Sequence, residues 1–353
     1  MERSNRMRHV IGVWGLLILL IILIAVFAIL RPHTFLTAFN FQSILTNKSV
    51  AALLALAVLI PMAANHFDLS AGYMLGISQV LAIGLQSETG QGLPWFVAVL
   101  LVLALGALVG LINGLLVTRV KIDSFIATLG TGTILYGLNQ WYTGGQQVLG
   151  HLADPFLAIS GIIAFGIPAP AVYVLIVALL LWLTFEFLPV GRFLYVLGAS
   201  LRAAELNGIS PTRYITLAFV ASGSIAAFAG IILQSQLQVG QSSVGQEYLL
   251  PSFTAALLGA TSIRPGRVNV WGTILAVAVL SVTVAGLNQL GAPFFVEPLF
   301  NGSMLILAVG LAVTAARRRT AAGTQAEQAA LAAVPEKATL APADLSLGDM
   351  TDE

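Results

Sequence analysis

Few side chains in this sequence have the types and spacing that catalysis requires. Carboxylates such as Asp68, Glu186 and Glu247 form no acid/base pair in sequence. The histidines are scattered without His-x-x-x-His spacing and the chain contains no cysteine, so the sequence indicates no metal site. No lysine falls in a Gly-x-x-x-x-Gly-Lys-Ser/Thr loop. We therefore expect no catalytic residue, metal or cofactor in this chain, and no ATP hydrolysis by a Walker-type site.

Amides and hydroxyls inside apolar segments are the second group of candidates. In hydrocarbon such groups either face a polar path or hydrogen-bond across helices, and for any single residue the second role is the more frequent. The candidates for lining a translocation path are Asn65, Gln79, Asn113, Thr128, Thr131, Asn139, Asn288 and Asn301. Asp68 either caps the helix that follows it or binds a cation, and we favour the cap.

The segment from Gly191 to Pro211 is the most informative polar stretch. It predicts a short Ala-rich helix over residues 200–206 that ends at Gly208 in a left-handed C-cap, with Ser210-Pro211 starting the next helix. A short helix that projects from a membrane bundle can dock into a groove on a partner. An ordinary polar connection is the alternative.

The composition decides which elements must position these residues. Of 353 residues, 58% are hydrophobic and only 9% are charged. This composition excludes a secreted enzyme, a nucleic-acid binder and a disordered chain, and it predicts an all-α, polytopic membrane bundle. Apolar runs predict about ten transmembrane helices, at 10–30, 49–65, 72–86, 94–118, 125–141, 170–188, 214–233, 249–262, 269–288 and 298–316.

Two of these runs, 72–86 and 249–262, are short. Short or interrupted spans in transporters often belong to broken helices beside a substrate path. Helices that tilt less, or that pack entirely inside a bundle, are the alternative.

The lysines and arginines predict how the bundle is oriented in its membrane. With ten spans, the basic connections around Arg119, Arg192 and Arg264 share one side with both termini, which the positive-inside rule assigns to the cytoplasm. We expect a cytoplasmic segment at 1–9, a transmembrane domain at 10–319 and a disordered, acidic cytoplasmic tail at 320–353. The loop at 142–170 has no basic residue and is predicted to be external and irregular.

Several blocks, in order along the chain, resemble ABC importer permeases of the ribose/xylose type. The Gly191–Pro211 segment is similar to that family's coupling loop, with Gly191-Arg192, Ala203-Ala204 and Gly208-Ile209 at matching positions. The other matching blocks are Phe67-Asp68-Leu69-Ser70-Ala71-Gly72, Asn113-Gly114 with Phe125-Ile126-Ala127-Thr128-Leu129-Gly130-Thr131, and Leu258-Gly259-Ala260-Thr261-Ser262. Two positions depart from the pattern: Ser200 replaces a common Asn, and Arg264-Pro265-Gly266-Arg267-Val268 replaces a glycine-rich turn.

The resemblance implies a permease for a monosaccharide or related small polar solute of the pentose or hexose class. It implies a second permease subunit, identical or a paralogue, two ATP-binding subunits that hydrolyse ATP, and a periplasmic binding protein that delivers the solute. The residues that it places in the coupling segment are Gly198, Ser200, Arg202, Ala203, Ala204, Glu205, Asn207, Gly208 and Pro211.

Two other functions stay open. A related permease for branched-chain amino acids or nucleosides has a similar pattern of spans. A secondary transporter or channel working alone is the second alternative, and it predicts ionisable residues inside the spans for ion coupling. The spans here contain few such residues.

Overall fold

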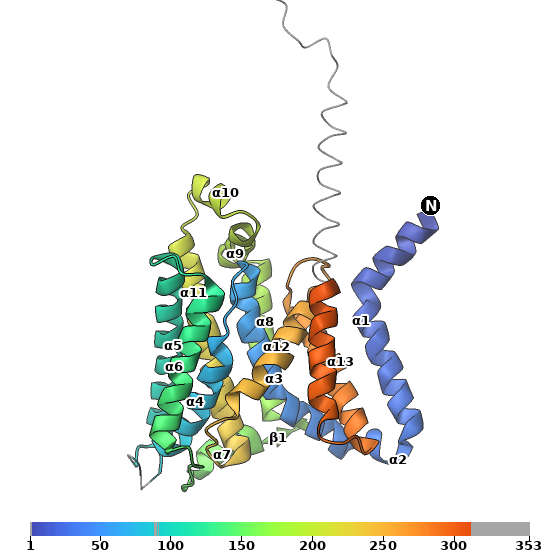
Figure 1. Ribbon diagram of the computed structural model, residues 1–353. Coiled ribbons are helices and arrows are strands. Elements are labelled where there is room, and N and C mark those ends of the chain that lie inside the picture. The colour runs from blue at the N-terminus through green and yellow to red at the C-terminus, as the bar shows by residue number, and fades with distance from the viewer. Residues whose placement is uncertain (1, 88–89, 91, 312–353) are drawn as a thin grey trace, which may run out of the picture.

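The computed structural model describes residues 2–87, 90 and 92–311 as a bundle of helices (Figure 1). The predicted tail at 320–353 lies outside the described residues. The elements are α1 (Glu2–Leu30), α2 (Pro32–Phe35), α3 (Ala38–Ala63), α4 (Ser70–Gly84), α5 (Trp95–Thr118), α6 (Ser124–Thr143), α7 (Asp154–Gly161), β1 (Ile163–Ala164), β2 (Ile167–Pro168), α8 (Ala169–Glu186), α9 (Pro189–Ala199), α10 (Leu201–Leu206), α11 (Pro211–Leu237), α12 (Gly245–Gly259) and α13 (Val270–Gln289). A further apolar helix follows over Val296–Leu311.

The bundle has two distinct ends. The first, named the α10 end, carries α9, α10, the start of α1 and the turns that join α5 to α6 and α12 to α13 (Figure 1). The second, named the α7 end, carries α2, α7 and the β1–β2 pair. Arg119 and Arg264 of these turns and Arg192 of α9 thus share the α10 end with the beginning of the chain, as their spacing predicts.

The helices support a polytopic membrane bundle. Among the described residues, 6 helices are long and apolar enough to cross a membrane, and Ser70–Gly84 and Val296–Leu311 are shorter apolar helices. Each predicted apolar run corresponds to a helix, and residues 312–316 of the last run lie outside the described residues.

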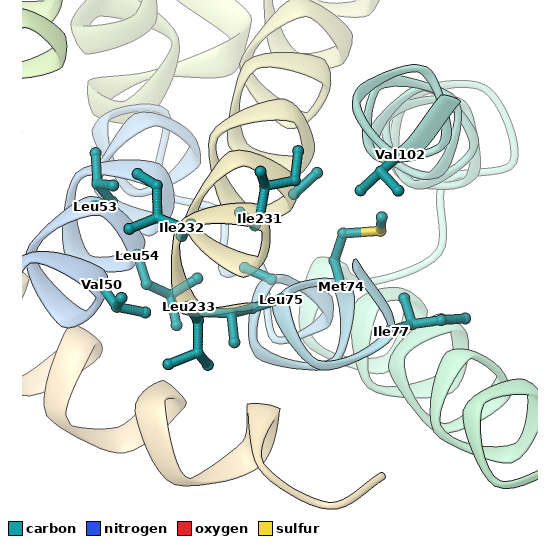
Figure 2. Packing of buried hydrophobic residues seen from close by; sticks show 14 of the residues in the cluster. Val50, Leu53, Leu54, Met74, Leu75, Ile77, Val102, Ile231, Ile232 and Leu233 are labelled. Atoms are coloured by element: carbon teal, nitrogen blue, oxygen red, sulfur yellow. The ribbon is translucent and has the colours of Figure 1, made fainter. Parts of the chain in front are cut away.

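The core forms where α11 packs against α3, α4 and α5. Figure 2 shows side chains of Val50 and Leu53 from α3, Leu75 from α4 and Ile232 from α11 converging in this region. Val102 of α5 and Met74 of α4 extend the same cluster. These apolar side chains from segments far apart in sequence hold the helices in one bundle.

Glycines set the spacing of α5 and α11. A Cβ added at Gly110 would lie 2.2 Å from the Phe219 carbonyl oxygen, and one at Gly114 would lie 2.6 Å from Thr216 Cα. Gly106 faces Gly223 in the same way, with its added Cβ 2.5 Å from that residue's oxygen. The four-residue spacing therefore permits backbone-to-backbone packing, as small residues do in membrane helices.

The two short runs differ in their surroundings. Helix α4 has 15 residues and most of them are buried, so it packs inside the bundle. Residues 64–69 lead into it without helical structure and lie along α6, where the Leu69 N–H donates to Thr128 Oγ1 at 3.1 Å. Helix α12 also has 15 residues, contains Pro251, and lines a cavity described below.

The predicted irregular loop at 142–170 is more ordered than its Gly and Pro content indicates. It contains α7 and the antiparallel β1–β2 pair, in which Ile163 pairs with Pro168. Pro155 sits in the first turn of α7, where its missing N–H costs no helical hydrogen bond. The prediction of a wholly irregular loop is therefore wrong.

Candidate translocation and coupling sites

The predicted coupling segment folds into a helical hairpin made of α9 and α10, named the α9–α10 hairpin. Ser200 is the N-cap of α10, and its Oγ accepts from the Ala203 N–H at 3.3 Å. At the other end, Gly208 adopts φ +75° and the Ile209 N–H donates to the Ala204 carbonyl at 3.0 Å. The predicted helix, its left-handed glycine and the start of α11 at Pro211 are all confirmed.

Most residues of α10 are exposed, and the polar residues that flank this helix also stabilise the hairpin. Arg202, Ala203 and Glu205 are exposed, beside the exposed apolar side chains of Leu201 and Leu206. The Ala204 side chain is fully buried against the bundle. Ser200 caps α10, and Asn207 donates from Nδ2 to the Ala203 carbonyl at 2.8 Å, so both polar side chains already serve the hairpin itself.

Helix α9 anchors this hairpin to the bundle. The Tyr195 hydroxyl donates to the Val268 carbonyl at 2.7 Å, and the Phe193 ring packs edge-on against Tyr214 of α11 with centroids 5.0 Å apart. A Cβ at Gly198 would lie 2.5 Å from the Ala63 carbonyl oxygen, so α9 touches the end of α3 backbone to backbone. Burial raises the pKa of the Tyr195 phenol, which keeps the hydroxyl protonated as a donor.

The turn that departs from the glycine-rich family pattern completes this anchor. Arg267 lies over the Tyr195 ring at 4.1 Å from its centroid, and Arg264 forms an ion pair with Glu186 of α8 at 2.7 Å. Asn269 caps α13, its Oδ1 accepting from the Gly272 N–H at 2.8 Å. The arginines therefore connect the turn to α8 and α9.

A cavity of about 750 Å³, named the outer cavity, opens at the α7 end. Helices α3, α11, α12, α13 and the following helix contribute its walls. Its polar lining includes Lys48, Gln236, Gln246, Glu247, Tyr248, Glu297 and Asn301. Lys48 Nζ and Glu297 Oε1 lie 3.1 Å apart, and both side chains are part-exposed at 30% and 39%.

A second cavity, of about 530 Å³ and named the inner cavity, lies at the α10 end. Asn65 and His66 from the connection after α3 line it, together with Tyr195 and Gly198 of α9 and Arg267 of the 260–269 turn. Asn65 adopts φ +61°, the left-handed region that non-glycine residues rarely occupy. The inner cavity thus adjoins the base of the α9–α10 hairpin.

Of the predicted path residues, only Asn65 and Asn301 line these cavities. Asn288 is exposed near the end of α13 and lines neither cavity. Thr128 bonds to the connection before α4, its Oγ1 accepting from the Leu69 N–H at 3.1 Å. The other four candidates belong to two groups of hydrogen bonds, one between helices and one between helices and a loop.

The first group is a buried polar cluster around Asp68. Its Oδ1 accepts from the Ser70 hydroxyl at 2.6 Å and from the Ser70 N–H at 3.1 Å, while its Oδ2 accepts from the Ser222 hydroxyl at 2.7 Å. Asn113 donates to Ser70 Oγ at 2.8 Å and accepts from Thr131 Oγ1 at 2.7 Å. Asp68 therefore holds the first turn of α4, as predicted, although it stands one residue before the N-cap Leu69 and also reaches α11.

The second group holds the connection between α11 and α12. Gln79 donates to the Val239 carbonyl at 2.7 Å and accepts from the Gln241 N–H at 3.3 Å. Asn139 donates to the Ser242 carbonyl at 2.9 Å. In the structure these amides hydrogen-bond a helix to a loop. Their place in a translocation path stays a prediction.

Sequence reasoning missed most of the outer cavity's polar lining. Gln236 and Gln246 lie at the end of α11 and the start of α12, where their polarity is typical of any loop-proximal residue. The unusual frequency of glutamine between Gln234 and Gln246 was the available signal. It could not show which amides face a cavity, because Gln234 and Gln241 line neither one.

Comparison with known proteins gives the same family as the motifs. Residues 40–314 match the family model described as "Branched-chain amino acid transport system / permease component". The chain belongs to this permease family. The match covers every element from α3 to the end of the described structure, including the α9–α10 hairpin and both cavities.

Curated relatives match over most of their own length. The ribose import permease protein RbsC of Haemophilus influenzae is 32% identical over 295 residues, which cover 83% of this chain and 90% of that protein. RbsC of Bacillus subtilis is 33% identical, covering 82% and 89%. The galactose/methyl galactoside import permease protein MglC of H. influenzae is 32% identical, covering 84% and 91%. No solved structure matches the chain.

Proposed function

We propose that this chain is the membrane permease subunit of an ATP-driven importer for a monosaccharide or related small polar solute. Two ATP-binding subunits would dock at the α10 end, a second permease subunit would pair with this one, and a periplasmic binding protein would deliver the solute at the α7 end. Both termini would then be cytoplasmic, in a cell inner membrane. The relatives named for ribose and galactose import support a pentose or hexose as the solute.

The α9–α10 hairpin is the observation that carries this proposal. Its tip exposes Arg202, Glu205 and Leu206, while its base is fixed by Tyr195 and Gly198. A partner that moves the tip therefore moves α9, and with it the end of α3, as a rigid body. The inner cavity adjoins these same residues, so closure of ATP-binding subunits would change its shape.

The test is charge reversal at the tip in the reconstituted transporter. With Arg202→Glu and Glu205→Lys combined, we expect ATP-dependent sugar uptake to fall at least tenfold, a loss of about 1.4 kcal/mol of coupling. Uptake into proteoliposomes and ATPase rate are the measurements. Arg119→Glu, an exposed charge at the same end outside the hairpin, is the matched control.

Two results would contradict the proposal. Unchanged uptake in the doubly reversed variant would show that the α9–α10 hairpin is not the docking element. Sugar uptake that persists without ATP and without any co-purifying ATP-binding subunit would favour a secondary transporter.

A branched-chain amino acid is the second candidate solute, because the family description names that class. Competition of unlabelled L-leucine against labelled D-ribose or D-galactose uptake, in the presence of the cognate binding protein, separates the two. The sugar proposal expects no competition by leucine.

A further inference from the structure

The outer cavity is lined in part by polar side chains without a hydrogen-bond partner among the described residues, and it lies away from the α9–α10 hairpin. We propose that it is a binding site, on this chain itself, for one neutral polyhydroxylated solute of monosaccharide size. This inference rests on the proposed importer function and assigns where the solute is held after it leaves the binding protein.

The size and the two-sided lining of the cavity fit such a solute. Its volume of about 750 Å³ falls within the range of small-molecule sites, roughly 300–1,000 Å³. Leu280 and Val284 of α13 give an apolar side, and Gln236, Gln246 and Asn301 give a polar side. A pyranose or furanose has the same two sides, a C–H face and a rim of hydroxyls.

Hydrogen-bonding capacity is available on the polar side. Gln246 and Glu247 are exposed and Asn301 is half-buried, and none of these three side chains hydrogen-bonds to another described residue. Amides both donate and accept, while a carboxylate accepts only, so together they can pair with hydroxyls in either sense. A sugar that left these groups unpaired would bind poorly, since each unmatched polar group keeps its desolvation penalty.

The charges of the lining disfavour anionic groups on a solute. Lys48 is engaged by Glu297 at 3.1 Å, which leaves the carboxylate of Glu247 as the unpaired charge. A phosphorylated sugar would meet this negative charge, and the carboxylate of an amino acid would find no unpaired cation among the described residues that line the cavity. A neutral polyol meets neither obstacle.

The absence of cysteine from the sequence makes a direct test possible. Asn301→Cys places a lone thiol in the outer cavity, and Asn288→Cys places one at an exposed position that lines neither cavity. Each variant is assembled with its ATP-binding subunits in proteoliposomes, and the alkylation rate by a membrane-impermeant maleimide is measured. The probes are D-ribose and D-galactose, with L-leucine and ribose 5-phosphate for comparison.

We expect millimolar D-ribose or D-galactose to slow alkylation of Asn301→Cys at least threefold and to leave Asn288→Cys unchanged. Leucine and ribose 5-phosphate should protect neither. Gly302→Cys repeats the test if the first variant assembles poorly, because a Cβ at this cavity-lining glycine meets no atom within 4 Å.

The outcomes separate this inference from the importer function. Absence of protection by a sugar that the same proteoliposomes import would overturn the site and leave the importer standing. Protection by leucine or ribose 5-phosphate but not by sugar would overturn the solute class. Failure of the wild-type assembly to import any sugar would overturn the proposed function, and this site with it.

Discussion

The α5–α11 contact and the helix at 296–311 both consist of apolar residues with glycines, yet they pack in opposite ways. Gly110 of α5 lies so close to Phe219 that no side chain can be added there. Gly302 and Gly310 face open space, and among residues 296–311 only Ala308 is buried. The first region is a fixed frame, and the second is a thinly packed wall of the outer cavity. Glycine frequency alone does not distinguish a frame from a wall.

Gly110→Leu should have the largest effect, because it forces α5 away from α11 where the backbones touch. We expect a loss of more than about 3 kcal/mol, above the usual cost of overpacking, and little folded protein. Gly302→Leu is the matched control and should change stability by no more than about 0.5 kcal/mol. Size-exclusion profiles and thermal unfolding in detergent measure both. Equal damage from the two variants would refute the contrast between frame and wall.

Asp68→Ala should have an intermediate effect inside the frame. It removes the acceptor for the Ser70 and Ser222 hydroxyls, which are buried between α4 and α11. We expect a loss of about 1–3 kcal/mol, since buried donors left without partners keep their desolvation cost. Asp154→Ala, at an exposed aspartate in the first turn of α7, should be nearly neutral in the same thermal unfolding assay. A neutral Asp68→Ala would show that this cluster does not fasten α4.

Lys48→Glu should have the smallest effect on stability, below about 1 kcal/mol, because the Lys48–Glu297 pair is part-exposed. We expect instead faster maleimide labelling of Asn301→Cys, because two glutamates at positions 48 and 297 repel each other and separate the 296–311 helix from α3. The reciprocal swap Lys48→Glu with Glu297→Lys should return labelling to its original rate. An unchanged labelling rate in both variants would mean that this ion pair does not hold the 296–311 helix against α3.

Local patterns predicted much of the α10 end. Ser200 and Gly208 delimit α10 through short-range capping, and Pro211 starts α11 for the same kind of reason. These features depend on residues within one turn of each other, so a sequence contains all of their information. The four-residue spacing of Gly106, Gly110 and Gly114 is also a local pattern, although the helix that packs against it, α11, lies far along the chain.

The sequence could not predict which amides bond to another segment and which line a cavity. Gln79 and Asn301 are both polar side chains in apolar runs, but Gln79 bonds to Val239 on a distant loop while Asn301 lines the outer cavity. Their partners lie far along the chain, and a helix's own periodicity does not identify them. The order within the 142–170 loop was missed for a different reason. Strands β1 and β2 have only two residues each, which is too short to show an alternating pattern in the sequence.

The sequence by itself determined the membrane class, the apolar helical segments, the basic end and the short helix α10, because apolar length, charge and capping act locally. Only the tertiary structure decided that α4 is enclosed, that Asp68 joins α4 to α11, and that residues from α3, α11, α12 and α13 enclose one cavity. Those features depend on which helices pack together, and packing is a property of the whole bundle rather than of any one segment.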